Sequence, residues 1–176
     1  MNANKQAIFE EAKALLDEWY PDIPREDGCC LYWNQVAMRT LLVHGYKPIM
    51  QAGSMHWKIN RNPDPNVADT FGYEWSPHTP LSQSQIYNGL LPEVHIWAAL
   101  PETGELIDFS TGSIKAIATE RFGFIWDRED PPEFVWGAPP LGTIYVPNRQ
   151  AMAFVWRFIL RIQGLTEESS YGRVYV

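Results

Sequence analysis

Three side chains in this sequence have the types and the chain order of a cysteine nucleophile, its acid–base partner and an orienting carboxylate. They are Cys30, His95 and Asp108. In such a set a thiolate attacks a carbonyl carbon, an imidazole moves the proton, and a carboxylate holds the imidazole in one tautomer. Whether these three side chains can meet depends on the elements that carry them.

Cys30 is the first residue of a predicted helix that runs from about 30 to 44 and ends at Gly45. At 100° per residue Cys30 faces inward, whereas Cys29 is turned away. The unpaired N–H groups and the positive dipole end favour a thiolate there and could hold an oxyanion. The alternative is that Cys30 is a small buried hydrophobe, as most lone cysteines are. The positions that share its helix face are Trp33, Ala37, Leu41 and His44.

His95 lies in a predicted β-hairpin whose register can be derived. Residues 93–100 and 105–110 have strand composition, and Pro-Glu-Thr-Gly stands between them. A two- or a four-residue turn gives one and the same register, in which Trp97 faces Asp108. His95 and Asp108 are then diagonal neighbours on one face, with Cβ atoms under about 7–8 Å apart. A three- or five-residue turn would reverse the parity and separate them.

Both hairpin residues also have ordinary structural interpretations. Asp108 could cap the Ser-Thr-Gly turn that follows it, and His95 could be a core histidine whose hydrogen bonds are satisfied. A carboxylate in an apolar strand is nonetheless costly to bury without a partner, and His95 supplies one. The sequence therefore favours a His95–Asp108 pair, with the second ring nitrogen left for the thiol.

A metal centre is the main competing interpretation of the cysteines and histidines. The adjacent Cys29 and Cys30 and the scattered histidines lack the C-x-x-C or H-x-x-x-H spacing of a structural zinc site. His44, at the far end of the Cys30 helix, is roughly 20 Å from the thiol at 1.5 Å per residue. We therefore expect neither a metal nor a cofactor.

The predicted elements follow the order of an α+β domain: helices, then antiparallel strands, then a helix. No repeat or linker divides the chain, so we expect one domain over residues 1–176. The last helix is apolar nearly all round, which predicts that it is buried or is a homo-oligomer interface. Helices are expected at 4–19, 30–44, 113–126 and 149–162, and strands at 47–59, 70–76, 93–100, 105–110 and 143–147, with polar proline-bearing loops at 60–66, 76–85 and 127–133.

Charge and cysteine content exclude several classes of function. The net charge is −7, from 21 acidic and 14 basic residues without a basic run, so we expect no nucleic-acid partner. No apolar stretch reaches the length that spans a bilayer, and the N-terminal segment lacks the basic-then-apolar order of a signal peptide. A disulfide between adjacent cysteines is strained, which favours reduced thiols and a cytoplasmic location.

Two short motifs resemble the transglutaminase-like superfamily. Gly28-Cys29-Cys30, followed by a helix ending Leu41-Leu42-Val43-His44-Gly45, is similar to its nucleophile helix, and His95-Ile96-Trp97 followed by Leu106-Ile107-Asp108 is similar to its H-x-W…D hairpin. The order Cys, His, Asp also resembles arylamine N-acetyltransferases and, with Asn in third place, the papain clan. The resemblance covers roughly residues 28–110 and includes nothing after them.

The resemblance implies a papain-like fold in which a nucleophile helix packs on an antiparallel sheet, flanked by N- and C-terminal helices. It also implies acyl chemistry through a Cys30 thioester, on a peptide, a protein or a small amide. Hydrolysis is the first choice, and transfer to an amine is the second. The alternative is a non-catalytic ligand- or protein-binding module on the same scaffold.

The sequence departs from the family pattern at two places near the nucleophile. Papain-like enzymes carry a Gln shortly before it, where this chain has Pro24-Arg25-Glu26-Asp27, and Asn34 stands where the family has a small residue. The second oxyanion donor is therefore unassigned. The candidates for oxyanion or substrate binding are Gln51, His56, Trp57 and Trp97.

Overall fold

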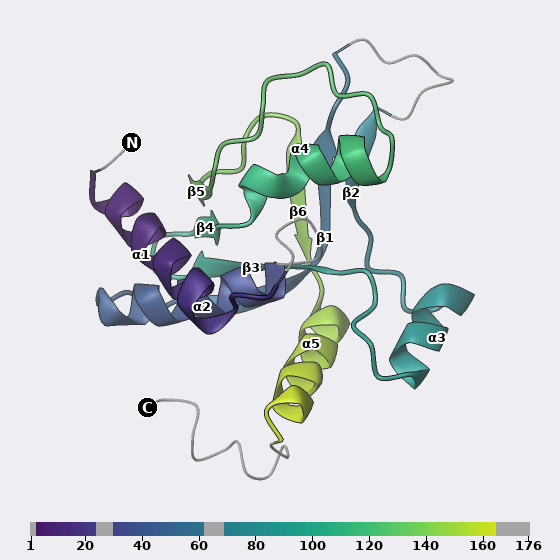
Figure 1. Cartoon of the computed structure of the whole chain (residues 1–176), viewed down its shortest axis with the longest axis horizontal. Helices are drawn as coiled ribbons and strands as arrows, with labels where there is room; N and C mark the ends of the chain where they lie inside the picture. Colours follow the sequence, from purple (N-terminus) through teal and green to yellow (C-terminus); the bar gives the residue numbers. More distant parts are fainter. Residues whose placement is uncertain (1–2, 24–29, 62–68, 165–176) are drawn as a thin grey trace.

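A computed structural model describes residues 3–23, 30–61 and 69–164 as an α+β fold with a curled, half-barrel antiparallel sheet (Figure 1). The predicted class is confirmed, and so are the N- and C-terminal helices. The helices are α1 (Ala3–Trp19), α2 (Cys30–Val43), α3 (Pro80–Tyr87), α4 (Ile114–Ala116) and α5 (Arg149–Ile162). The strands are β1 (Ile49–Lys58), β2 (Thr70–Tyr73), β3 (His95–Leu100), β4 (Glu105–Asp108), β5 (Val135–Gly137) and β6 (Thr143–Pro147).

Strand β1 is the centre of the sheet and is paired along both edges. Gly53 pairs with His95 of β3 and with β6, and Met55 pairs with Tyr73 of β2 and with β6. Since a residue has one partner on each edge, β3 and β2 follow each other along the edge opposite β6. The β1–β3 ladder ends at Gly53 and the β1–β2 ladder begins at Met55, so Ser54 has no partner on this edge among the described strands. The edge therefore has a break between Tyr73 of β2 and His95 of β3.

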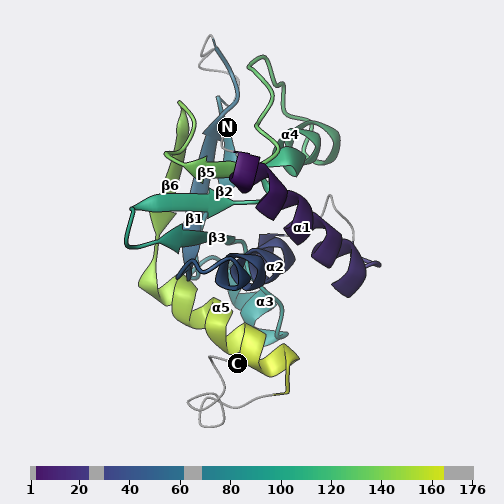
Figure 2. The same cartoon turned by 90° about the vertical axis from the view of Figure 1, so that its left-hand side faces the viewer.

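Apolar side chains on alternate positions of the strands bury the two faces of the sheet. One face packs against α1, α2 and α5, which lie one below the other beside the sheet in Figure 2. The other face packs against the segment that contains α4 and its flanking 3-10 (Thr111–Ser113) and π (Ile117–Arg121) turns. Strand β3 contributes Ile96 and Ala98 to the first face, and His95 and Trp97 to the second.

The structure corrects several element predictions. Residues 80–87 form α3 within a segment expected to be a loop, because Pro80 follows an N-cap, Thr79, whose hydroxyl accepts from Ser82 N at 3.2 Å. The helix expected over 113–126 is a series of short turns that ends at Arg121. Strand β5, which has only three residues, was not predicted.

Helix α5 has the predicted bounds and cap, since the Asn148 side chain accepts from Gln150 N at 2.9 Å and from Ala151 N at 3.1 Å. It is less buried than its composition suggested, and Ile162 is exposed. Its buried stripe is Ala151, Val155, Ile159 and Leu160. None of the helices in the described ranges is both long and apolar enough to cross a bilayer.

Candidate active site

The β3–β4 hairpin has the predicted register and brings His95 to Asp108. Leu100 pairs with Glu105 across a four-residue turn, which Gly104 closes by donating its N–H to the Leu100 carbonyl at 2.8 Å. His95 therefore shares a sheet face with Asp108, and its Nε2 lies 2.6 Å from Asp108 Oδ2. The predicted imidazole–carboxylate hydrogen bond is confirmed.

The Asp108 carboxylate accepts four hydrogen bonds and is only 2% exposed. Oδ1 accepts from Ser110 N at 2.9 Å and from Ser110 Oγ at 2.7 Å, while Oδ2 accepts from Tyr145 Oη at 2.8 Å and bonds His95 Nε2. Burial alone would raise the pKa of Asp108. The charge of His95 and the hydrogen bonds from His95 and Ser110 outweigh burial and lower it, so Asp108 is ionised at neutral pH.

The His95 ring is held between aromatic rings. It stacks on Tyr73 with ring centres 5.5 Å apart and on Trp97 with centres 6.0 Å apart, and is 1% exposed. Burial lowers its pKa, but the charge and hydrogen bond of Asp108, together with Cys30, raise the pKa of His95 to about 10. The site therefore holds an imidazolium at neutral pH.

Cys30 is the first residue of α2 and lies next to the break between Tyr73 and His95 on the edge of β1. Its Sγ makes a long contact of 3.9 Å with the carbonyl oxygen of Val94, the residue before β3. Cys30 lies on the helix-covered side of the sheet and His95 on the other, and both line one small cavity of about 10 Å³. The break between Tyr73 and His95 thus lets a thiol and an imidazole from opposite faces approach each other.

The second nitrogen of His95, Nδ1, is buried and has no hydrogen-bond partner among the described residues. Cys30 stands near enough to raise the pKa of the imidazole, although it does not complete a hydrogen bond to Nδ1.

Cys30 also lines a much larger open pocket, of about 770 Å³. Strand β2, helix α3, the approach to β3 and the segment after α4 form its walls, which are largely apolar and aromatic. His56 and Glu74, whose Nε2 and Oε2 atoms lie 3.2 Å apart, supply polar groups, and Glu93 lies beside them. Its apolar lining includes Phe71, Leu81, Leu91, Phe122 and Phe124.

Of the four predicted oxyanion or substrate-binding residues, His56 alone lines the pocket that contains Cys30. Gln51 lines a separate pocket of about 620 Å³ beside α5. Trp57 is buried against Trp126, and Trp97 lies beneath the His95 ring. The predictions for Gly28, Cys29 and residues 24–27 lie outside the described residues.

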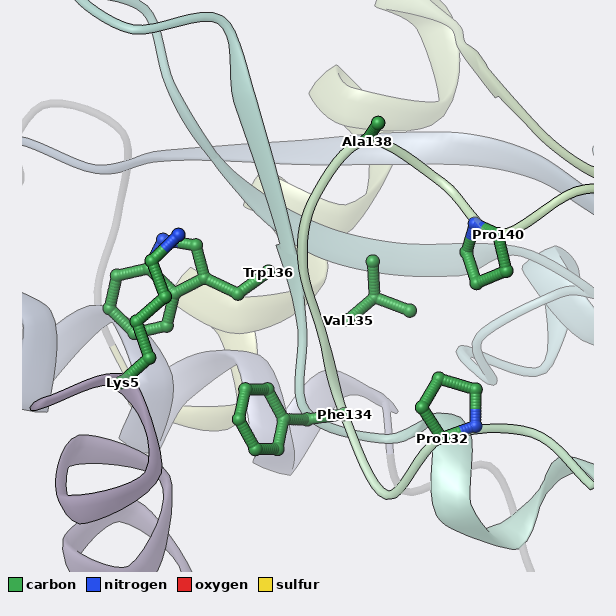
Figure 3. A pocket seen from close by; sticks show the side chains of 7 residues that line it. All are labelled: Lys5, Pro132, Phe134, Val135, Trp136, Ala138 and Pro140. Atoms are coloured by element: carbon green, nitrogen blue, oxygen red, sulfur yellow. The ribbon is translucent and has the colours of Figure 1, made fainter. Parts of the chain in front are cut away.

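A third pocket, of about 300 Å³, lies beside β5 (Figure 3). The Lys5 ammonium lies 5.1 Å from the centre of the Trp136 ring there and 2.7 Å from Glu105. The residues that line this pocket include neither a thiol nor a histidine, so it is not a second copy of the Cys30 site. Within the described ranges, no group of three or more His, Cys, Asp or Glu side chains could hold a metal ion.

Tyr145, Ser110 and Tyr73 are the site residues that sequence reasoning missed as functional. The predicted register, in which Trp97 faces Asp108, also puts Ser110 opposite His95 when it is extended by two residues, so the neighbourhood of Ser110 was foreseeable. Tyr145 comes from β6, 37 residues after Asp108, and no local pattern links the two. Tyr73 reaches His95 only because β2 and β3 share one edge of β1.

Comparisons with known proteins leave the site to be interpreted from its own chemistry. No family model, no curated protein and no solved structure matches this chain.

Proposed function

We propose that this chain is a cysteine-dependent acyl-transfer enzyme of the transglutaminase-like, papain-like type. Cys30 is the nucleophile, His95 the acid–base group and Asp108 the residue that orients it. The observation that carries the proposal is that Cys30 and His95 line one cavity while Asp108 bonds the far nitrogen of the imidazole at 2.6 Å. That is the connectivity of a nucleophile, a base and an orienting group.

The reaction begins when the Cys30 thiolate attacks the carbonyl carbon of an amide. The S–C bond forms, the C–N bond breaks, and the leaving amine takes a proton from the His95 imidazolium. Water then attacks the thioester and gives one proton back to His95. The S–C bond breaks, the acid is released, and the thiolate is restored. In transfer, a second amine takes the place of water.

The 770 Å³ pocket beside Cys30 supports a substrate with an apolar or aromatic part. Three of its polar residues, His56, Glu74 and Glu93, lie next to one another. The substrate class we propose is a peptide, a protein segment or a small amide. Hydrolysis is the first choice because the pocket is open and admits water.

A non-catalytic binding module is the second candidate. Its supporting observation is that Cys30 is only 7% exposed and that the cavity it shares with His95 holds about 10 Å³. That volume is at the limit for one water molecule and too small for a scissile group, so a substrate would have to reach the thiol from the larger pocket that Cys30 also lines.

Acylation by activated esters tests the proposal directly. We expect 4-nitrophenyl acetate and 4-nitrophenyl phenylpropanoate to give one hydroxylamine-sensitive acyl adduct on Cys30 by intact-mass and peptide mass spectrometry. Cys29→Ala is the matched control and should keep the adduct, Cys30→Ala should lose it, and His95→Ala should slow its formation by about 10²-fold or more. The binding module would be favoured if the wild-type chain formed no thioester. It would also be favoured if Cys30→Ala formed the same adduct as the wild type.

A further inference from the structure

We infer that Tyr145 is a positioning residue that sets the strength of the His95–Asp108 pair, because its hydroxyl shares the carboxylate oxygen to which His95 is bonded. This inference rests on the proposed function for its catalytic meaning. Its structural core, the coupling of Tyr145 to His95 through Asp108, can be tested without any substrate.

Two donors converge on one oxygen of Asp108. Tyr145 Oη lies 2.8 Å from Oδ2, and His95 Nε2 lies 2.6 Å from the same atom. An ionised carboxylate only accepts, so the phenol must donate. Burial, followed by the charge and hydrogen bond of Asp108, raises the pKa of Tyr145 well above its ordinary value, which keeps the donor proton in place.

Packing aims the hydroxyl of Tyr145 at Asp108. Strand β6 pairs with β1 so that Tyr145 stands opposite Met55, on the face that carries His95. The Tyr145 ring meets Trp97 edge-on with centres 5.2 Å apart, and its centre is 5.8 Å from that of His95. A phenol fixed in this way restrains the carboxylate from β6, while Ser110 restrains the other oxygen from the segment just after β4.

The shared oxygen has a chemical consequence as well as a geometric one. A carboxylate oxygen with two donors is a weaker partner for each of them than an oxygen with one. Tyr145 therefore moderates how strongly Asp108 holds the imidazolium proton, which His95 must release to a leaving amine. Other titratable groups that face His95 are Cys30 from α2 and Tyr73 from β2.

Removal of the hydroxyl should strengthen the remaining bond. In Tyr145→Phe we expect the Nε2 proton of His95 to move downfield in the proton NMR spectrum at neutral pH. We also expect the His95 titration midpoint to rise by about half a unit to one unit, the equivalent of one hydrogen bond. Placing 3,5-difluorotyrosine at position 145 makes the phenol a stronger donor, and both changes should then reverse.

Tyr20→Phe is the matched control, since it removes a hydroxyl that donates to Gln35 from a position between α1 and α2. It should leave both His95 signals unchanged. Unchanged His95 signals in Tyr145→Phe, or shifts of the same sign in Tyr145→Phe and the difluorotyrosine protein, would overturn the inference. Because these signals need no substrate, they are separable from the acylation assay: failure of acylation alone removes the proposed function and leaves the coupling standing.

Discussion

The Nε2 of His95 and the Oδ2 of Asp108 lie 2.6 Å apart with both side chains almost fully buried, at 1% and 2% exposure. Two opposite charges are thus removed from water together, an arrangement that is costly unless every polar atom is satisfied. Asp108 meets that condition with four donors, whereas His95 leaves Nδ1 unpaired toward Cys30. The carboxylate is therefore fully hydrogen-bonded, whereas one ring nitrogen of the imidazole has no partner within the part of the chain that the structure describes.

The stability of the fold should depend on pH through this pair. The pKa of His95 is raised from 6.5 to about 10, so its contribution is fully present below pH about 6.5 and is lost as pH rises toward 10. The pKa of Asp108 is lowered, so its contribution is present above about pH 4 and is lost as pH falls below that. We expect the free energy of unfolding, measured by urea denaturation, to be highest between pH about 4 and 6.5. His95→Gln should flatten the decline between pH 7 and 10; an equally steep decline in the variant would contradict this assignment.

Loss of the buried carboxylate should be far more damaging than loss of an exposed one. Asp108→Ala leaves His95, Ser110 and Tyr145 without their acceptor, and we expect it to cost about 3–5 kcal/mol of unfolding free energy. Asp130→Ala is the matched control, because Asp130 pairs with Lys115 at the surface and should cost about 0–1 kcal/mol. Equal costs for the two variants, in denaturant melts at pH 7, would show that the buried network adds nothing.

The sequence predicted the parts of this site that depend on local periodicity. Hairpin parity placed His95 beside Asp108, and helix phase placed Cys30 at the inward-facing start of α2. Tyr145 and Tyr73 could not be found in this way, because their contacts depend on which strands share the edges of β1. The same non-local pairing decides that Gln51 and Trp97 lie away from the Cys30 pocket, although their residue types suit an oxyanion or substrate role.

Helix α3 and strand β5 were not predicted, for reasons that do not involve strand pairing. The N-cap and first-turn proline of α3 are local signals, but the polar composition around them favours a loop. Strand β5 has only three residues, too few for alternation to be visible. The strands also approach each other closely at Gly53 and Gly72, which residue propensity does not describe.

One such close approach lies at Gly53, and it predicts a large effect for a small substitution. A Cβ at this position would lie 2.0 Å from the Val146 carbonyl oxygen of β6, and neither backbone can move without breaking the ladder that also holds His95. We expect Gly53→Ala to cost several times more unfolding free energy than Gly104→Ala. Gly104 has open space around it and only a positive φ, a cost of about 1–2 kcal/mol. Thermal melts of the two variants give the comparison, and a milder effect at Gly53 would argue against the close β1–β6 approach.

The absence of a metal from the two cysteines remains a prediction. Thiolate reactivity in the proposed site comes from a helix N-terminus and an imidazolium, and neither needs a metal. Elemental analysis of protein purified without chelators should therefore find far less than one zinc per chain. One zinc per chain, lost together with Cys30→Ala and Cys29→Ala, would support a metal centre instead.

The last prediction concerns the rate at which iodoacetamide alkylates Cys30 at pH 7. If the His95 imidazolium and the start of α2 stabilise its thiolate, iodoacetamide should label Cys30 in preference to Cys29. His95→Ala removes the counter-charge, so labelling of Cys30 at pH 7 should slow by about tenfold or more, on the order of 1.4 kcal/mol.

Asp108→Asn should slow labelling less, because Asp108 touches the imidazole and not the thiol. Peptide mass spectrometry after brief labelling at pH 7 measures all three chains, with Cys29→Ala as the control that should match the wild type. Preferential labelling of Cys29 would shift the nucleophile by one residue and undo the helix phase on which the site depends. Labelling of Cys30 that is no faster than that of free cysteine, and that His95→Ala leaves unchanged, would make Cys30 a structural thiol.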